Sequence, residues 1–197
     1  MMEAFTTLNA AALPIATHNL DTDRIVPARF LQKPRAAPFG DFLFQDWRRG
    51  ADGQPDPNFA FNQAPYRAAR IIVAARNFGC GSSREHAVWA LFDAGFRCVI
   101  APSFGDIFRS NAMKNGLLPV QLPEAEVERL LAALQAAPGA RITVDLAAQQ
   151  VTAPDGSTHR FEMEPFAKQC LLEGMDELGY TLTLASQVAA FERSYRY

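Results

Sequence analysis

The chain has 197 residues, of which 49% are hydrophobic and 20% charged, so it is long enough for one domain with a substantial apolar core. Its formal net charge of -2 gives no general attraction for nucleic acid or an anionic membrane, so any anion binding must be local. No apolar run approaches the roughly 18 residues that span a bilayer, and the first residues lack the basic-then-apolar pattern of a signal peptide. We therefore expect a cytoplasmic protein that binds neither nucleic acid nor membrane.

Three cysteines and three histidines are scattered along the chain, and there is no Cys-x-x-Cys pair. A self-contained zinc or iron–sulfur site is therefore not expected, and the odd cysteine count favours free thiols. We predict no metal or cofactor on this chain by itself. The residues concerned are Cys80, Cys98 and Cys170, and His18, His86 and His159.

The first predicted element is a strand over residues 12–16, followed by a polar turn over 19–23. Within the turn, Asp21 and Asp23 could together bind a divalent cation. A structural turn is favoured instead, because Asp and Asn side chains cap backbone turns, and Arg24 could pair with either acid.

Residues 32–69 form the most irregular region, with five prolines and three glycines. This density of helix and strand breakers predicts loops and short helical turns. Loops of this length are usually functional or mobile, and we expect considerable mobility here without a partner. Because aromatic residues occur over 39–47, part of the region should pack against the body of the domain. Arg35 lies within it, and a lone arginine in such a loop is usually only solvated.

The clearest pattern follows this region. Residues 70–75 are a short β-branched apolar run that predicts a buried strand, residues 83–92 predict a helix, and residues 96–101 predict a second buried strand. A strand, a helix and a strand within about thirty residues form a βαβ unit with parallel strands. The sequence therefore indicates an α/β fold with a mostly parallel central sheet.

The rest of the chain continues in the same manner. Residues 105–115 predict a helix with core aromatics, and residues 117–122 predict a strand whose Pro119 places it at a sheet edge. An amphipathic helix is expected over 123–137. Two alternating strands over 141–146 and 149–152 should lead into a hairpin turn at residues 155–156. Helices over 165–173, ended by Gly174, and over 186–193 complete the prediction.

The loop over residues 77–86, between the buried strand and its helix, carries the strongest functional signal. Gly79 and Gly81 allow a tight turn that exposes backbone N–H groups, and the first turn of a helix adds unpaired donors with partial positive charge. Ser82 and Ser83 add hydroxyl groups, and Arg84 adds a guanidinium. Together these groups predict a receptor for a carboxylate or phosphate.

Simpler interpretations of this loop account for only part of it. Ser82 and Glu85 fit a capping box, which would account for one serine and the glutamate alone. The loop lacks the Gly-Lys-Ser/Thr ending of a Walker loop, and Arg84 stands where a dinucleotide fingerprint needs glycine. Cys80 is better explained as a small buried thiol than as a nucleophile, and His86 as a packed residue than as a base.

Several segments taken together resemble one family. Several pieces are similar, in order, to the small subunits of 3-isopropylmalate dehydratase (isopropylmalate isomerase), in the aconitase superfamily: residues 19–31, 39–48, 77–87, 100–104, 106–108, Asn111 and 117–120. The Gly-Ser-Ser-Arg-Glu-His segment over residues 81–86 is a specific marker of that superfamily. The resemblance covers nearly the whole chain, and the long loop resembles that of the bacterial-type small subunit.

The resemblance implies a single swivelling β/β/α three-layer domain over residues 1–197, with a long loop insertion at about 32–69. It implies a heterodimer with a large subunit that carries a [4Fe-4S] cluster, and a small dicarboxylate as substrate. By the same resemblance, Ser82 corresponds to the catalytic base, while Ser83 and Arg84 contact substrate carboxylate. The family often has a basic residue flanked by threonine and glycine before Phe39-Gly40, and Arg35 would take that role here among prolines and alanines.

The implied reaction moves a hydroxyl group between neighbouring carbons by dehydration and rehydration, with the open iron of the cluster as Lewis acid. Serine is a weak base, so Ser82 needs its alkoxide stabilised by the helix start, the loop N–H groups and Arg84. Three alternatives stay open at this point. One is a related hydro-lyase for citraconate, homoaconitate or dimethylmaleate, one is a stand-alone carboxylate-binding module, and one is a purely structural scaffold.

Overall fold

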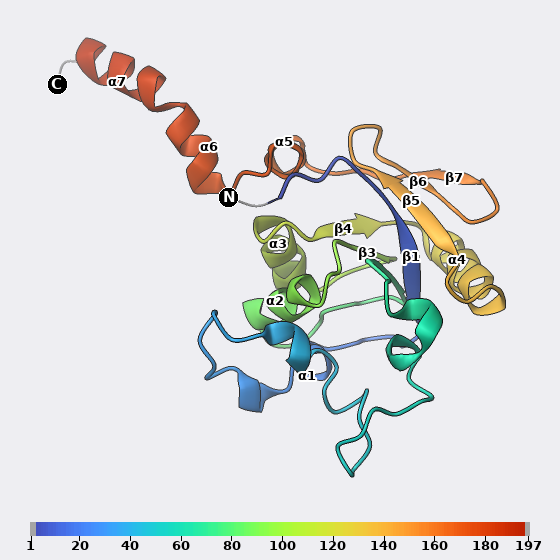
Figure 1. Cartoon of the computed structure of the whole chain (residues 1–197). Helices are drawn as coiled ribbons and strands as arrows, with labels where there is room; N and C mark the ends of the chain where they lie inside the picture. The colour runs from blue at the N-terminus through green and yellow to red at the C-terminus, as the bar shows by residue number, and fades with distance from the viewer. Residues whose placement is uncertain (1–2, 196–197) are drawn as a thin grey trace.

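The computed structural model describes residues 3–195, built around one curled seven-stranded sheet (Figure 1). The strand order is β4-β3-β2-β1-β5-β6-β7. The strands are β1 (Thr7–Ile15), β2 (Ile71–Ala74), β3 (Cys98–Ala101), β4 (Leu118–Gln121), β5 (Arg141–Asp145), β6 (Gln150–Thr152) and β7 (Thr158–Arg160).

Strands β1 to β4 pair in parallel, whereas β1, β5, β6 and β7 pair in antiparallel fashion. Strands β1 to β4 and β6 therefore point one way and only β5 and β7 the other, which confirms the predicted mostly parallel sheet. Strand β1 joins the two halves, because its residues 7–11 pair with β5 and its residues 12–15 pair with β2. The predicted start of this strand at residue 12 was therefore wrong.

Two apolar clusters lie on opposite sides of the parallel strands. Strand β2 shows why, since Ile72 and Ala74 belong to one cluster while Ile71 and Val73 belong to the other. Side chains alternate between the faces of a strand, so a continuous apolar run is what a strand covered on both faces requires.

Two helices cover one face, and a third helix covers the other together with the antiparallel strands. Helices α2 (Glu85–Asp93) and α3 (Asp106–Lys114) contribute to the first cluster. Helix α4 (Glu124–Ala136) and strands β5 and β6 contribute to the second, together with the inward residues of β2, β3 and β4. The result is a layer of helices, a layer of parallel strands and a layer of antiparallel strands (Figure 1), consistent with the predicted β/β/α arrangement.

The irregular region contains only short turns of 3-10 helix, as its breakers predicted. These are η2 (Phe39–Phe42), η3 (Ala60–Asn62) and η4 (Ala64–Tyr66). Phe39, Leu43 and Phe44 are fully buried in the first cluster, so the aromatic stretch does pack down. Gly40 lies so close to α2 that an added Cβ would stand 2.8 Å from the backbone N of Ala94.

The remaining elements lie at the two ends of the chain. Helix α1 (Thr22–Ile25) and the 3-10 turn η1 (Ala28–Phe30) follow β1. Helices α5 (Pro165–Glu173), α6 (Glu177–Thr183) and α7 (Ala185–Ser194) end it. Helices α6 and α7 extend away from the body, and α6 was not predicted (Figure 1). No helix in residues 3–195 has both the length and the apolar character needed to cross a bilayer.

Candidate functional site

Two segments flank the loop over residues 77–86 beyond the carboxyl ends of β1, β2 and β3 and hold it in place. On one side, Gly79 N–H donates to the Leu20 carbonyl at 2.7 Å, and Thr22 N–H donates to the Cys80 carbonyl at 3.0 Å. On the other side, the amide N–H of Asn77 donates to Ser103 Oγ at 2.9 Å. Because consecutive parallel strands end at one edge of a sheet, motifs distant in the sequence become neighbours here.

Gly79 requires glycine for two reasons. Its φ of 71° lies in the left-handed region, which costs residues with a Cβ about 1–2 kcal/mol. An added Cβ would also stand only 2.3 Å from Cγ of Phe108 on α3. Gly81 has a φ of 86° as well, so the backbone turns sharply on both sides of Cys80.

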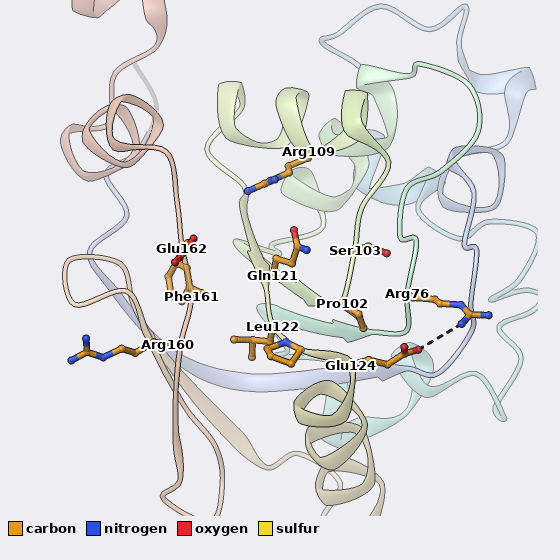
Figure 2. A pocket seen from close by; sticks show the side chains of 11 residues that line it. Arg76, Pro102, Ser103, Arg109, Gln121, Leu122, Glu124, Arg160, Phe161 and Glu162 are labelled. Carbon is orange, nitrogen blue, oxygen red and sulfur yellow. Dashed lines mark ion pairs between the residues drawn. The ribbon is translucent and has the colours of Figure 1, made fainter.

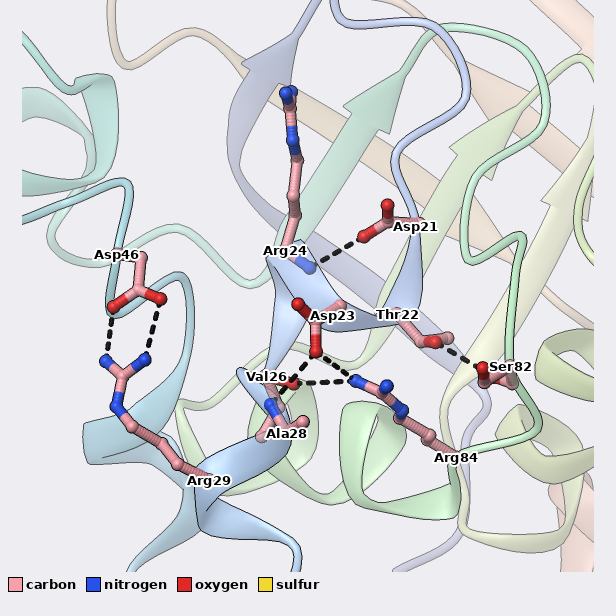
Figure 3. Close-up of polar contacts among 10 residues, drawn as sticks. All are labelled: Asp21, Thr22, Asp23, Arg24, Val26, Ala28, Arg29, Asp46, Ser82 and Arg84. Atoms are coloured by element: carbon pink, nitrogen blue, oxygen red, sulfur yellow. Dashed lines mark hydrogen bonds and ion pairs between the residues drawn. The ribbon is translucent and has the colours of Figure 1, made fainter.

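Ser82 lies before the helix rather than capping it. Helix α2 begins at Glu85, and the residue preceding it, Arg84, is extended, with no side-chain hydrogen bond capping this end among the described residues. The Glu85 carboxylate instead accepts a hydrogen bond from Asn115 Nδ2 at 2.8 Å. The capping-box interpretation and the predicted helix start at Ser83 were therefore wrong, because Thr22 Oγ1 holds the Ser82 carbonyl at 2.9 Å outside the helix (Figure 3).

This arrangement leaves the start of α2 free to attract an anion. Ser82 and Ser83 are both exposed on the approach to the uncapped helix start. Backbone N–H groups in the first turn of a helix carry partial positive charge, and within residues 3–195 no side chain accepts a capping hydrogen bond from them, while the acidic side chain of this turn, Glu85, accepts from Asn115. The predicted combination of exposed hydroxyl groups and helix start is therefore present in the structure.

Arg84 forms an ion pair with Asp23. Its Nη1 donates to Asp23 Oδ1 and, at 3.5 Å, to the Val26 carbonyl (Figure 3). This hydrogen bond is the main reason that the pKa of Asp23 is lowered below its ordinary value of 3.8. Arg24 could have paired with either aspartate, but its guanidinium carbon lies 6.0 Å from the centre of the Trp47 ring instead.

The polar turn over residues 19–23 is structural, as predicted. Asp21 caps helix α1, because its Oδ1 accepts the Arg24 backbone N–H at 2.7 Å. Sequence patterns recognised this turn as capped. They did not reveal that Thr22 and Asp23 would contact the serine loop, since no local signal links segments separated by 60 and 61 positions.

Arg35 lies at the other end of α2. It forms two hydrogen bonds with the Asp93 carboxylate, at 2.8 and 2.9 Å, and stacks over Trp89 with its guanidinium carbon 5.2 Å from the ring centre. Asp93 is the last residue of α2, whereas Arg84 directly precedes its first residue. The structure thus brings Ser82, Ser83 and Arg84 into one turn and places Arg35 apart from them.

Cys80 and His86 occupy packed positions beside the loop. Burial and the nearby Asp21 carboxylate raise the pKa of the Cys80 thiol, which disfavours the thiolate that a nucleophile needs. The His86 ring packs against Trp89 and Phe39, with ring centres 4.6 and 5.5 Å apart. Both observations agree with the structural roles predicted for these residues.

The cysteines do not form a metal site within the described residues. Cys98 and Cys170 are buried, the three thiols are free, and no group of three or more metal-binding side chains occurs in residues 3–195. An iron–sulfur cluster needs several converging thiolates, so the side chains of this chain do not fit one.

Comparison with known proteins agrees with this geometry. The sequence model of the aconitase C-terminal domain matches residues 2–125, and the model described as LeuD_N matches residues 128–165. A 3-isopropylmalate dehydratase small subunit from Paramagnetospirillum magneticum is 50% identical over 98% of this chain and 96% of its own length. The chain belongs to the family of 3-isopropylmalate dehydratase small subunits.

Two further members of this small-subunit family extend the comparison. The small subunit from Anaeromyxobacter sp. (strain K) is also 50% identical, over 99% of this chain and all of its own length. A crystal structure of 3-isopropylmalate dehydratase from Methanocaldococcus jannaschii superposes with a TM-score of 0.67 at 26% identity, covering 94% of this chain and 99% of that one. The small-subunit family, and with it the aconitase-type fold that the resemblance over nearly the whole chain implied, is thereby confirmed.

Proposed function

We propose that this chain is the small subunit of an isopropylmalate isomerase, which interconverts 2-isopropylmalate and 3-isopropylmalate in leucine biosynthesis. The observation that carries the proposal is the position of Ser82, exposed before an uncapped helix start in a loop built from the Gly-Ser-Ser-Arg-Glu-His segment. Near full-length similarity to proteins named 3-isopropylmalate dehydratase small subunit supports it.

Ser82 is the proposed base. The reaction removes a proton from one carbon and hydroxide from its neighbour, and then adds both back in exchanged positions. The Ser82 alkoxide would be stabilised by the first N–H groups of α2 and by the turn between Gly79 and Gly81. The proton taken up by Ser82 Oγ is returned when the double bond is hydrated again.

Arg84 and Ser83 are the proposed contacts for a substrate carboxylate. Within the described residues, both hydrogen bonds of the Arg84 guanidinium come from Nη1, so its remaining N–H groups are available for a carboxylate. Asp23 holds the guanidinium toward Val26, away from Ser82 (Figure 3). We therefore propose that Arg84 keeps Asp23 as its orienting partner through Nη1 while its remaining N–H groups bind the carboxylate.

Arg35 is a proposed contact for the part of the substrate remote from Ser82. Its ion pair with Asp93 allows a substrate contact to be distinguished from a purely structural role, because Arg35→Gln and Asp93→Asn break the same ion pair. A substrate contact predicts that only Arg35→Gln raises KM. Equal effects of the two variants on stability, with no effect on KM, would assign Arg35 to the fold alone.

A large subunit is the proposed partner in a heterodimer, because the relatives are named as small subunits. The Lewis acid for the departing hydroxyl group is proposed to be a [4Fe-4S] cluster on that subunit. We also keep the sequence-based expectation that the assembly works in the cytoplasm.

Co-expression with the candidate large subunit tests the proposal. The isolated chain should be inactive, and the assembled pair should convert isopropylmalate with the absorbance of isopropylmaleate as readout. Ser82→Ala should lower kcat by about a hundredfold or more. Ser110→Ala, an exposed serine on α3, is the matched control and should leave kcat unchanged.

Full activity of Ser82→Ala would remove Ser82 from the role of base. Comparison of kcat/KM for citraconate, homoaconitate and dimethylmaleate tests the substrate, and a higher value for any of them would replace isopropylmalate in the proposal. If the chain bound carboxylates but formed no complex with a large subunit, it would instead be a stand-alone binding module.

A further inference from the structure

A polar cleft of about 700 Å³ opens beside Ser103 (Figure 2). Its walls come from the carboxyl ends of β2, β3 and β4, from α3, and from the residues at the end of β7. This volume lies within the range of about 300–1,000 Å³ that small-molecule sites occupy. Its polar lining includes Arg76, Ser103, Arg109, Gln121, Arg160 and Glu162.

Arg109 is the unusual member of this lining. Its Nε is buried without a hydrogen-bond partner, and no ion pair or side-chain hydrogen bond engages its guanidinium within residues 3–195. Arg97 also has an unpartnered Nε, but its Nη1 and Nη2 bind the carboxylate and carbonyl of Glu3. A half-buried guanidinium without any partner has lost water contacts without replacement, which an added anion would correct.

The charge balance of the cleft also favours an anion. Three arginines and two glutamates line it, so the cleft has one more positive than negative side chain. Glu124 is already near Arg76, at 3.9 Å. Glu162 lines the same cleft but forms no ion pair with Arg109 within the described part of the chain.

We propose that this cleft binds the carboxylate of a small organic acid, with Arg109 as its anchor. Gln121, which Figure 2 shows pointing toward Arg109, supplies an amide donor. The proposal is independent of the function assigned above to the Ser82 loop.

The test is a titration of the full chain with succinate. Its readout is the set of side-chain Nε–H signals of the arginines in NMR spectra. The titration is performed in the Arg84→Gln background, which removes the proposed carboxylate contact at the Ser82 loop. The signal that disappears in an additional Arg109→Gln variant identifies Arg109. We expect this signal to shift saturably, and Arg109→Gln to weaken binding by roughly tenfold or more.

A second variant, at Gln121, keeps Arg109 and replaces the glutamine by a side chain of nearly the same size. Gln121→Glu places a carboxylate beside Arg109 and should abolish succinate binding by occupying the guanidinium internally. Gln135→Glu adds the same charge on an exposed position of α4, and Arg67→Gln removes an exposed arginine elsewhere, so both are matched controls that should bind as before.

Three results would overturn the proposal. Succinate could leave the Arg109 signal unmoved, or Arg67→Gln and Arg109→Gln could weaken binding equally, which would indicate attraction by overall charge alone. Inorganic phosphate could bind more tightly than succinate in the same titration, which would replace carboxylate as the ligand class. The amide spectra of all variants report whether each remains folded.

Discussion

Arg84 donates to the carboxylate of Asp23 across 61 positions of the sequence, and this ion pair ties the first helical turn of the chain to the loop that carries Ser82. The arginine side chain is only 16% exposed, whereas that of the aspartate is 57% exposed. Asp23 Oδ1 also accepts the Ala28 N–H at 2.9 Å, which fixes the carboxylate in place. The guanidinium is therefore oriented by a rigid partner.

Asp23→Asn should raise KM of the assembled enzyme for isopropylmalate by about three- to tenfold, because Arg84 loses its charged orienting partner. The asparagine Oδ1 still accepts the Ala28 N–H, so the turn remains. The value of kcat should change less than KM, as measured by steady-state kinetics.

Asp46→Asn is the control for this prediction. It breaks the ion pair of Arg29 and Asp46, whose side chains are 53% and 60% exposed, outside the serine loop (Figure 3). Its KM should equal that of the unmodified enzyme. The same rise in KM for both variants would show that surface charge, and not the orientation of Arg84, controls binding.

The Asp23 ion pair should also make stability depend on pH. Hydrogen bonding from Arg84 lowers the pKa of Asp23 in the folded chain below its ordinary value of 3.8. The folded state then binds fewer protons than the unfolded state, so the contribution is complete above pH 3.8 and disappears as pH falls through the lowered pKa.

Denaturant unfolding of the unmodified chain and Asp23→Asn measures this contribution. At neutral pH the unmodified chain should be more stable by less than about 1 kcal/mol, since the aspartate is largely exposed to solvent. The difference should vanish in strong acid, where Asp23 is protonated in both states. A difference that grew toward low pH would have the wrong sign for this ion pair.

Gly79→Ala should lower the free energy of unfolding more than Gly156→Ala does. Both glycines have positive φ, 71° and 85°, but only at Gly79 does an added Cβ meet another residue, Phe108. At Gly156 the added atom has no described neighbour within 4 Å. The excess, from overpacking, should be about 1–3 kcal/mol in denaturant unfolding. Equal losses would mean that Phe108 moves aside without cost.

Cys80 and Cys98 should react with a thiol reagent in a fixed order. Cys80 is partly exposed and should react first, but slowly at neutral pH, because burial raises the pKa of its thiol. Cys98 is fully buried, and burial raises the pKa of its thiol as well, so it should react only after unfolding. Absorbance of the released chromophore follows the reaction. Persistence of the first phase in Cys80→Ser would contradict this assignment.

Local sequence signals predicted the fold where those signals decide the structure. Helix α5 was predicted at both ends, since proline suits the first helical position and Gly174 adopts the left-handed conformation that ends it. Helix α6 was missed because it has only seven residues, one of which, Gly179, disfavours a helix. The first half of β1 was missed because it pairs with β5, more than 130 positions away.

The candidate site was predictable to a similar extent. Two glycines, two serines and an arginine in one turn identified the loop, because such a combination exceeds what a helix cap needs. The ion pairs of Arg84 and Arg35 were not predictable, since Asp23 and Asp93 are distant in sequence and each arginine had several acids within reach of a folded chain. Arg109 was read as part of a core helix, because an unpartnered guanidinium is visible only in three dimensions.

Strand β1 has a consequence for synthesis of the chain on the ribosome. It is made first, yet its two partners are residues 71–74 and 141–145, so neither half of the sheet can close until those residues have emerged. Pairings between distant residues slow folding, and an unpaired strand edge is prone to join other chains. A nascent chain stalled before residue 141 would expose the edge formed by residues 7–11. We therefore expect release of this protein from the ribosome to be a step at which aggregation competes with folding.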